Sequence, residues 1–90
     1  MVGTEKEEIV KKCTGVLEKM MKDISVPRNI RKSAIEIKNK LLNGDESQAV
    51  RAAAVISDLE ELTNNPNIPS HMRTSIWSIV SQLETISVEE

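Results

Sequence analysis

The side chains able to carry out catalysis are few in this sequence and lie far apart. Cys13 is the single cysteine and His71 the single histidine. A thiolate nucleophile needs a neighbouring base, and that base needs a third group to orient it, which neither residue has nearby. The acidic runs at 5–8 and 58–62 lack the Glu-x-x-His spacing of carboxylate metal sites in helical bundles. We therefore expect a non-catalytic chain that uses no metal and no cofactor.

Basic side chains gather between residues 28 and 40 and indicate a second kind of chemistry, contact with nucleic-acid phosphates. The composition argues against it, because the chain has a formal net charge of −2 and no aromatic residues among the basic ones for base stacking. Nucleic-acid contact is therefore the alternative hypothesis. Its candidate residues are Arg28, Arg31, Lys32, Lys38 and Lys40.

Trp77, the only aromatic residue, favours a protein interface. On a helix it lies about 100° from Ile76, beside the apolar seam, with Arg73 one turn away. Trp and Arg are enriched among the residues that dominate binding energy, although a tryptophan here can equally fill the edge of a helical core. Trp77 lies beside Val80, Arg73 and Glu84, and the Ser/Thr face of the same helix is poor in charge, as interface cores are. The candidate interface residues of this segment are Trp77, Arg73, Ser70, Thr74, Ser78 and Ser81.

A second uncharged stretch, "AVRAAAVI" at 49–56, is apolar almost all round, with Arg51 as its only charge. A helix that is apolar on all sides is buried by several neighbours or by a partner. Val50, Ala53 and Ala54 therefore join the candidate interface. We hypothesise that the chain is an interaction module that binds a protein partner or itself, as a homodimer.

Four amphipathic helices must position these residues, because apolar side chains recur along the chain at alternating spacings of three and four. In the first helix this seam runs from Val10 to Ile24, and Gly15 within it indicates a close approach by another helix. Asp45 is a suitable N-cap for the third helix, and Gly44 permits a left-handed end to the second. The predicted helices span roughly residues 5–22, 27–42, 46–63 and 69–86.

Two stretches of the chain are nearly the same. Residues 26–35 read "VPRNIRKSAI" and residues 68–77 read "IPSHMRTSIW", an offset of 42 residues. The same offset relates Leu41 to Leu83, and it extends back into the preceding helices. The repeat unit is therefore a whole helical hairpin rather than a short site.

Two hairpins, at about 4–42 and 45–86, predict a single all-α domain over 1–90, folded as an antiparallel four-helix bundle. The alternative is two HEAT-like units stacked as a short solenoid, because a period of 42 lies within the roughly 40–47 residues of that class. The first 42 residues carry ten basic and six acidic side chains, a charge of +4, and the remainder carry two and eight, a charge of −6. Charge is therefore divided between the predicted hairpins.

The composition favours a cytoplasmic protein. No apolar run approaches the roughly 20 residues that a membrane span needs, so we expect no membrane association. The charged start of the chain does not have the pattern of a signal peptide. A single cysteine excludes an internal disulfide and gives no sign of secretion.

Three segments resemble the signature segments of a known family. "VPRNIRKSA" at 26–34, "AVRAAAVIS" at 49–57 and "NNPNIPSHMRTSIWSIVSQLE" at 64–84 look like those of a small archaeal family of uncharacterised helical proteins. The resemblance covers nearly the whole chain. It implies a cytosolic archaeal protein with a compact four-helix fold, and it transfers no catalytic residue, cofactor or binding site.

Overall fold

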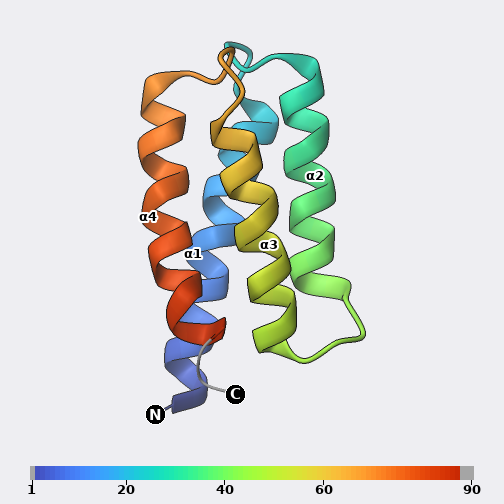
Figure 1. Cartoon of the computed structure of the whole chain (residues 1–90), viewed down its shortest axis with the longest axis vertical. Coiled ribbons are helices and arrows are strands. Elements are labelled where there is room, and N and C mark those ends of the chain that lie inside the picture. Colours follow the sequence, from blue (N-terminus) through green and yellow to red (C-terminus); the bar gives the residue numbers. More distant parts are fainter. Residues whose placement is uncertain (1, 88–90) are drawn as a thin grey trace.

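The computed structural model describes the backbone of residues 2–87 and the side chains of residues 7–86. Every regular element in this part of the chain is an α-helix, and each begins and ends within three residues of its predicted limits (Figure 1). The helices are α1 (Val2–Lys22), α2 (Arg28–Asn43), α3 (Gln48–Thr63) and α4 (Ser70–Ser87).

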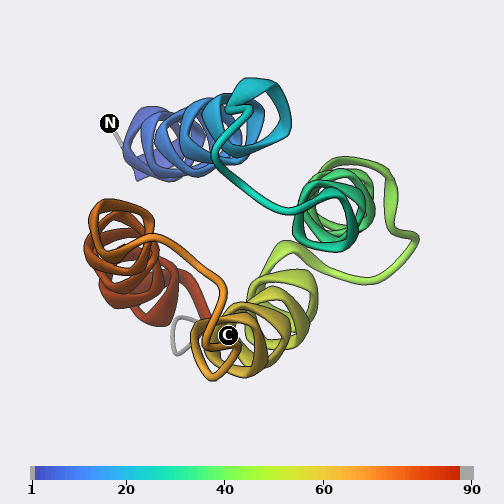
Figure 2. The ribbon, with the colours of Figure 1, turned by 90° about the horizontal axis from the view of Figure 1, so that it is seen from above.

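The four helices pack as a closed ring. Helices that follow one another in the chain contact each other, and α1 also packs against α4, which closes the ring. Figure 2 shows this square arrangement from above, and Figure 1 shows that neighbouring helices run in opposite directions. The predicted antiparallel four-helix bundle is therefore confirmed, because two units stacked as a solenoid would leave the first helix away from the last.

The centre of the ring is filled by aliphatic side chains from all four helices. Positions 42 residues apart are buried in both hairpins, so the repeat seen in the sequence is a repeat of the core. Each helix contributes one stripe of this core, as expected for amphipathic helices. The equivalent buried pairs are Cys13 and Val55, Leu17 and Leu59, Met20 and Leu62, Val26 and Ile68, Ile30 and Met72, Ala34 and Ile76, Ile37 and Ile79, and Leu41 and Leu83.

The turns that precede α2 and α4 are also equivalent. The Oδ1 atom of Asp23 accepts a hydrogen bond from the backbone N–H of Ser25 at 2.9 Å. The Oδ1 atom of Asn65 accepts one from the N–H of Asn67, also at 2.9 Å. Asp and Asn both favour this turn, in which a side-chain oxygen replaces a backbone acceptor. The duplicated stretches are therefore duplicated helix starts with the same turn before them.

A proline follows each of these turns and fixes the direction of the next helix. The carbonyl of Pro27 accepts from the N–H groups three and four residues later at 3.0 Å, and the carbonyl of Pro69 does the same. Pro27 occupies the N-cap of α2 rather than its first helical position. Both prolines lack an N–H at a point where a helix has no acceptor to offer it.

Two predictions about α1 are wrong. Ile24 is 93% exposed, and Val26 occupies the core in its place. The reason is that α1 ends at Lys22, so helical spacing no longer decides which residue faces inward. Gly15 faces open space, because a Cβ atom added there meets nothing within 4 Å. Within the described residues, no other helix comes within 4 Å of this position.

The predicted junction of α2 and α3 differs in its details. The N-cap of α3 is Ser47 and not Asp45, and the Ser47 side chain accepts from the N–H of Val50 at 3.3 Å. Gly44 is extended rather than left-handed, with φ −70° and ψ 150°. A Cβ atom on Gly44 would lie 2.6 Å from Cδ of Arg51. A side chain at position 44 would therefore require the Arg51 side chain to move.

Candidate functional site

Cys13 and His71 are held apart by the fold. Cys13 is fully buried in α1, and this burial raises the pKa of its thiol to about 12. His71 is exposed at the start of α4, where its Nε2 lies 3.4 Å from Oδ2 of Asp23. Asp23 follows Cys13 by ten residues, or about 15 Å of helix. The cysteine therefore behaves as a small buried apolar residue, beyond the reach of the only histidine.

A metal site needs clustered ligands, and a membrane span needs a long apolar helix. Within the part of the chain whose side chains are described, His, Cys, Asp and Glu nowhere form a group of three able to hold a metal ion. Over the same residues, each helix is too short or too polar to cross a membrane.

Most of the candidate interface residues lie on the outer surface of the second hairpin. Trp77 is 49% exposed and Val50 is 53% exposed, which are large values for apolar side chains of this size. Arg73 is half-buried, one turn before Trp77 on α4. We refer to this surface as the α3–α4 face. Its residues are Val50, Ala53, Ser70, Arg73, Thr74, Trp77, Ser78 and Ser81.

Trp77 lies on the side of α4 that is nearer α3. His71 reaches the end of α1, so its side of α4 faces α1. Around the helix, Trp77 lies about 100° from the buried Ile76 in one direction, and His71 lies about 140° from it in the other. The two interpretations of Trp77 are therefore combined, because one half of the side chain packs at the bundle edge and the other half is exposed.

Ala54 does not belong to the α3–α4 face. It lies one turn before Asp58, whose carboxylate contacts Lys40 of α2 at 2.6 Å. Residues four apart share one side of a helix, so Ala54 faces α2. The uncharged start of α3 is thus divided, with Ala53 on the side of α4 and Ala54 on the side of α2. Val50 lies between them around the helix, about 60° from Ala53 and about 40° from Ala54, and faces outward.

The α3–α4 face is poor in charge, and one of its hydroxyl groups is bonded within its own helix. Arg73 is the only charged residue among its members. The hydroxyl of Thr74 donates to the carbonyl of Ser70 at 3.2 Å, one turn back. Because this donor is already bonded within the helix, it loses no partner when another surface covers it. This hydroxyl can therefore be covered at little polar cost.

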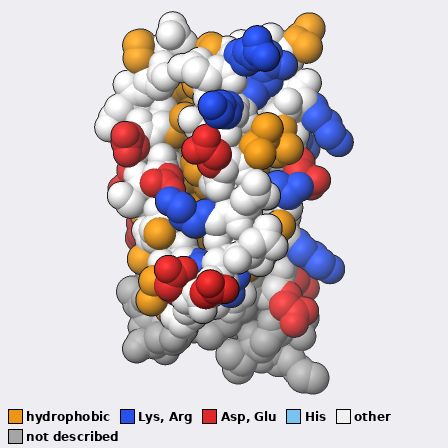
Figure 3. Space-filling model, turned by 90° about the vertical axis from the view of Figure 1, so that its right-hand side faces the viewer, with side chains coloured by type: hydrophobic (Ala, Val, Ile, Leu, Met, Phe, Trp, Pro, Cys, Tyr) orange, Lys and Arg blue, Asp and Glu red, His pale blue; other side chains and the backbone are white. Residues whose placement is uncertain are grey.

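The five basic candidates of α2 do not share one side of the helix. Nζ of Lys38 lies 3.3 Å from Oε2 of Glu18 in α1. Lys40 faces the opposite way, and its hydrogen bond to the Asp58 carboxylate raises its pKa. Figure 3 shows basic and acidic side chains mixed on the side of the molecule where α2 lies.

The remaining three basic candidates occupy the first turns of α2. Arg28 and Lys32 are exposed, and Arg31 is half-buried. Nucleic-acid contact by α2 thus stays a prediction, and it would depend mainly on these residues, because two of the five cations already neutralise acids of other helices.

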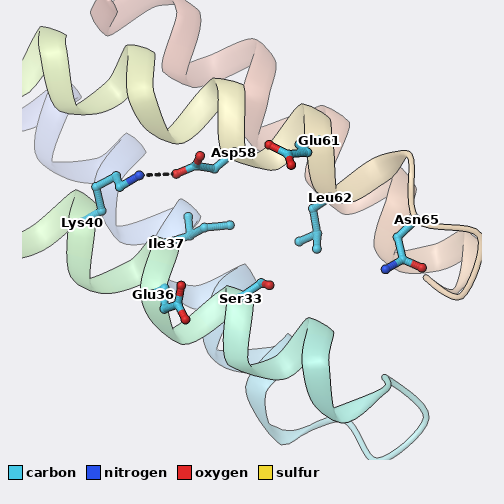
Figure 4. A pocket seen from close by; sticks show the side chains of 8 residues that line it. All are labelled: Ser33, Glu36, Ile37, Lys40, Asp58, Glu61, Leu62 and Asn65. Atoms are coloured by element: carbon cyan, nitrogen blue, oxygen red, sulfur yellow. Dashed lines mark hydrogen bonds and ion pairs between the residues drawn. The ribbon is translucent and has the colours of Figure 1, made fainter.

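A hollow of about 400 Å³ lies between α2 and α3. Figure 4 shows Ile37 and Leu62 pointing toward each other within it, with the ion pair of Lys40 and Asp58 at one end. We refer to it as the α2–α3 groove. The residues that line it are Ser33, Glu36, Ile37, Lys40, Asp58, Glu61, Leu62 and Asn65.

Sequence reasoning missed this groove because its walls come from separate helices. Glu36 stands out in the sequence only as the one acid of a basic helix, and Asp58 and Glu61 only as parts of a common acidic run. Their meeting depends on how α2 and α3 pack, and no local pattern reports that packing.

Comparison with known proteins places the chain in a family. A model described as the uncharacterised protein family UPF0147 matches residues 1–86. A UPF0147 protein from Methanosarcina mazei is 49% identical over 90 residues, which are 100% of this chain and 97% of the relative. One from Sulfurisphaera tokodaii is 45% identical over 82 residues, covering 91% of this chain and 92% of the relative.

A solved structure supports the same assignment. The crystal structure of a UPF0147 protein from Thermoplasma acidophilum matches with a TM-score of 0.83 at 38% identity, over 93% of this chain and 99% of that one. At this identity the likeness extends to sequence as well as fold. The chain therefore belongs to the UPF0147 family of uncharacterised archaeal proteins, which confirms the resemblance seen in its sequence.

Proposed function

We propose that the chain is a non-catalytic interaction module that forms a homodimer through the α3–α4 face. The observation that carries this proposal is the exposure of Trp77, at 49%, on a surface whose other members are small and almost uncharged. Burial of apolar surface contributes about 25 cal/mol per Å². Tryptophan and the half-exposed Val50 are therefore the strongest apolar anchors available on this side of the molecule.

The α3–α4 face has properties suited to a two-fold contact. In a symmetric dimer the same patch meets itself, so any net charge on the patch repels its copy. The α3–α4 face carries one positive charge, from Arg73, and Glu84, seven residues after Trp77 on the same side of α4, carries the opposite charge, so the net charge that meets its copy is small. The first hairpin is less suitable, because its residues up to 42 carry a charge of +4.

Helix α4 also presents a ridge that allows close approach. Ser70, Thr74, Ser78 and Ser81 follow one another at spacings of four, four and three along its outer side, and all four are exposed. Small side chains let two helix backbones approach closely. Helix α4 has 18 residues, or about 27 Å. Together with α3 it can supply the roughly 800 Å² per partner typical of a stable interface.

Trp77 itself provides the test, because it is the only aromatic residue and reports on its own surroundings. Light scattering at micromolar concentration is expected to give the mass of a dimer, and dilution to the monomer is expected to shift tryptophan emission to the red and increase its quenching by acrylamide. A strict monomer at these concentrations would contradict the proposal.

A matched pair of variants locates the interface. Trp77→Gln is expected to yield a folded monomer, checked by circular dichroism. Ile35→Gln is the control, because Ile35 is the equivalent residue of the first hairpin and is similarly exposed, at 42%. It is expected to remain dimeric. If Trp77→Gln stays dimeric, or if both variants dissociate alike, the α3–α4 face is not the interface.

A further inference from the structure

The α2–α3 groove has an apolar floor and polar walls. Ile37 and Leu62 form the floor and belong to the buried core. Ser33 lies on the α2 side, and Asn65 lies just beyond the end of α3 (Figure 4). The hollow is open to solvent along one side and therefore reaches the core without being enclosed. It can accept an aliphatic side chain presented from outside.

The charges of the groove are unbalanced. Three carboxylates line it, from Glu36, Asp58 and Glu61, against the single cation of Lys40. Lys40 is held by Asp58 at 2.6 Å. Within the described residues, the carboxylates of Glu36 and Glu61 form neither a hydrogen bond nor an ion pair. The groove thus keeps two negative charges beside an apolar floor.

We infer that the α2–α3 groove is a docking site for a basic segment of a partner protein, in which lysine or arginine residues alternate with aliphatic ones. The cations meet Glu36 and Glu61, and an aliphatic side chain covers Ile37 and Leu62. Charge complementarity favours a basic segment, because an acidic segment would be repelled by the carboxylates of Glu36 and Glu61.

A segment of chain fits the open groove better than a small free cation does. Small-ligand sites bury about 70–90% of the ligand surface, and a hollow that is open along one side covers only one side of what it holds. A side chain on a partner protein is already covered on its other side by that partner. The groove is therefore shaped to receive part of a larger surface.

This site is independent of the proposed homodimer. The groove is lined by α2, α3 and Asn65, and none of its residues belongs to the α3–α4 face. Binding at the groove is therefore expected to persist in Trp77→Gln. Failure of the dimer proposal leaves this inference standing, and the reverse also holds.

The probe for the site is a short fluorescein-labelled peptide that alternates lysine and leucine, and fluorescence anisotropy measures its binding to the full chain at low salt. Glu61→Gln is expected to weaken binding several-fold, and Glu36→Gln combined with Glu61→Gln by about tenfold. The matched control is Glu60→Gln, which removes the same charge from the adjacent position, about 100° around α3 and outside the groove. It is expected to bind the peptide like the parent chain.

Methyl resonances locate the peptide. The methyl groups of Ile37 and Leu62 are expected to shift on addition of the peptide, and a peptide that alternates lysine and serine is expected to shift them less. Equal weakening by Glu60→Gln and Glu61→Gln would overturn the inference, since it would show that the peptide responds to the overall negative charge of the protein and not to the groove. The inference would also be overturned if spermidine displaced the peptide and bound as tightly as the peptide does, because the groove would then be a site for a small cation.

Discussion

Lys38 of α2 and Val80 of α4 occupy equivalent positions in the two hairpins, 42 residues apart. Their neighbours are equivalent too, because Glu18 of α1 corresponds to Glu60 of α3. In the first hairpin, lysine and glutamate form an ion pair at 3.3 Å. In the second, Val80 is buried and Glu60 is exposed. The junction between the two helices is thus bridged by an ion pair in the first hairpin and filled by a buried apolar side chain in the second.

The outer positions diverge in the same direction. Arg28 corresponds to Ser70 and Lys32 to Thr74, so the second hairpin loses the cations of the first. Positions that are buried in both hairpins do not diverge in this way, since all of them remain apolar. A repeated core therefore supports two outer helix surfaces with different chemistry, basic along α2 and nearly neutral along α4. Surface residues, and not the fold, therefore distinguish the two hairpins.

The largest expected effect tests whether the two hairpins share one core. Leu17 and Leu59 are equivalent and both fully buried. Replacing either by alanine is expected to lower the free energy of unfolding by about 2–5 kcal/mol, through lost burial and the cavity left behind. Urea unfolding of Leu17→Ala and Leu59→Ala, followed by circular dichroism, measures the two costs.

One cooperative core predicts a single transition in both variants, with similar dependence on urea. Unfolding of either variant in two steps would contradict a single shared core, since it would show that one hairpin can unfold while the other stays folded. The variants must be compared at one protein concentration, because self-association adds to apparent stability.

A smaller effect is expected at Gly15, which corresponds to Ser57 of α3. Both are helical, and the space around Gly15 is open. Gly15→Ala is therefore expected to stabilise the chain by about 0.5–1 kcal/mol, because alanine loses less backbone freedom on folding. Ser57→Ala is the matched change in the other hairpin, with a smaller expected gain. Urea midpoints measure both, and a loss of stability in Gly15→Ala would show an unseen close contact.

Gly15 also illustrates what can be predicted from the sequence. Spacings of three and four identify which residues face the core while a helix continues, so the stripes of α2 and α4 were predictable. Such spacing says nothing after a helix ends, and Ile24 was misplaced because α1 stops at Lys22. A glycine signals a close approach only if a neighbour lies on its side of the helix, and the sequence does not show which side is outermost.

The candidate surfaces were predictable to different degrees. Most of the α3–α4 face follows from residues on one helix, whose relative directions are set by helical geometry. The α2–α3 groove depends on residues from two helices and on the space left between them. The directions of Lys38 and Lys40 were likewise hidden, because they are defined by the acids of neighbouring helices.

The ion pair of Lys38 and Glu18 is expected to contribute less than either preceding effect. Both side chains are partly exposed, and pairs of this kind contribute about 0.2–1 kcal/mol. A double-mutant cycle with Lys38→Met and Glu18→Gln isolates their coupling energy. The same cycle at high salt is expected to give a smaller value. A coupling of several kcal/mol would contradict this account and would make the polar edge a major source of stability.

The smallest effect separates the two turns by pH. Hydrogen bonds from the Ser25 hydroxyl, at 2.6 Å, and from the Ser25 N–H lower the pKa of Asp23, and the contact with His71 acts in the same direction. A carboxyl whose pKa is lowered by folding adds stability above its ordinary pKa, near 3.9, and loses it as the pH falls through the folded value.

The equivalent Asn65 makes the same turn without a titrating group, so acid is expected to weaken the turn of the first hairpin alone. Carbon NMR of the Asp23 carboxyl is expected to give a pKa below 3.9, and the amide proton of Ser25 is expected to shift over the same pH range while that of Asn67 stays constant. Asp23→Asn is expected to remove the pH dependence and to keep the turn, because an asparagine oxygen already accepts this bond in the second hairpin. If the Asp23 carboxyl titrated at or above its ordinary pKa, folding would not lower that pKa, and this source of a pH difference between the two turns would be absent.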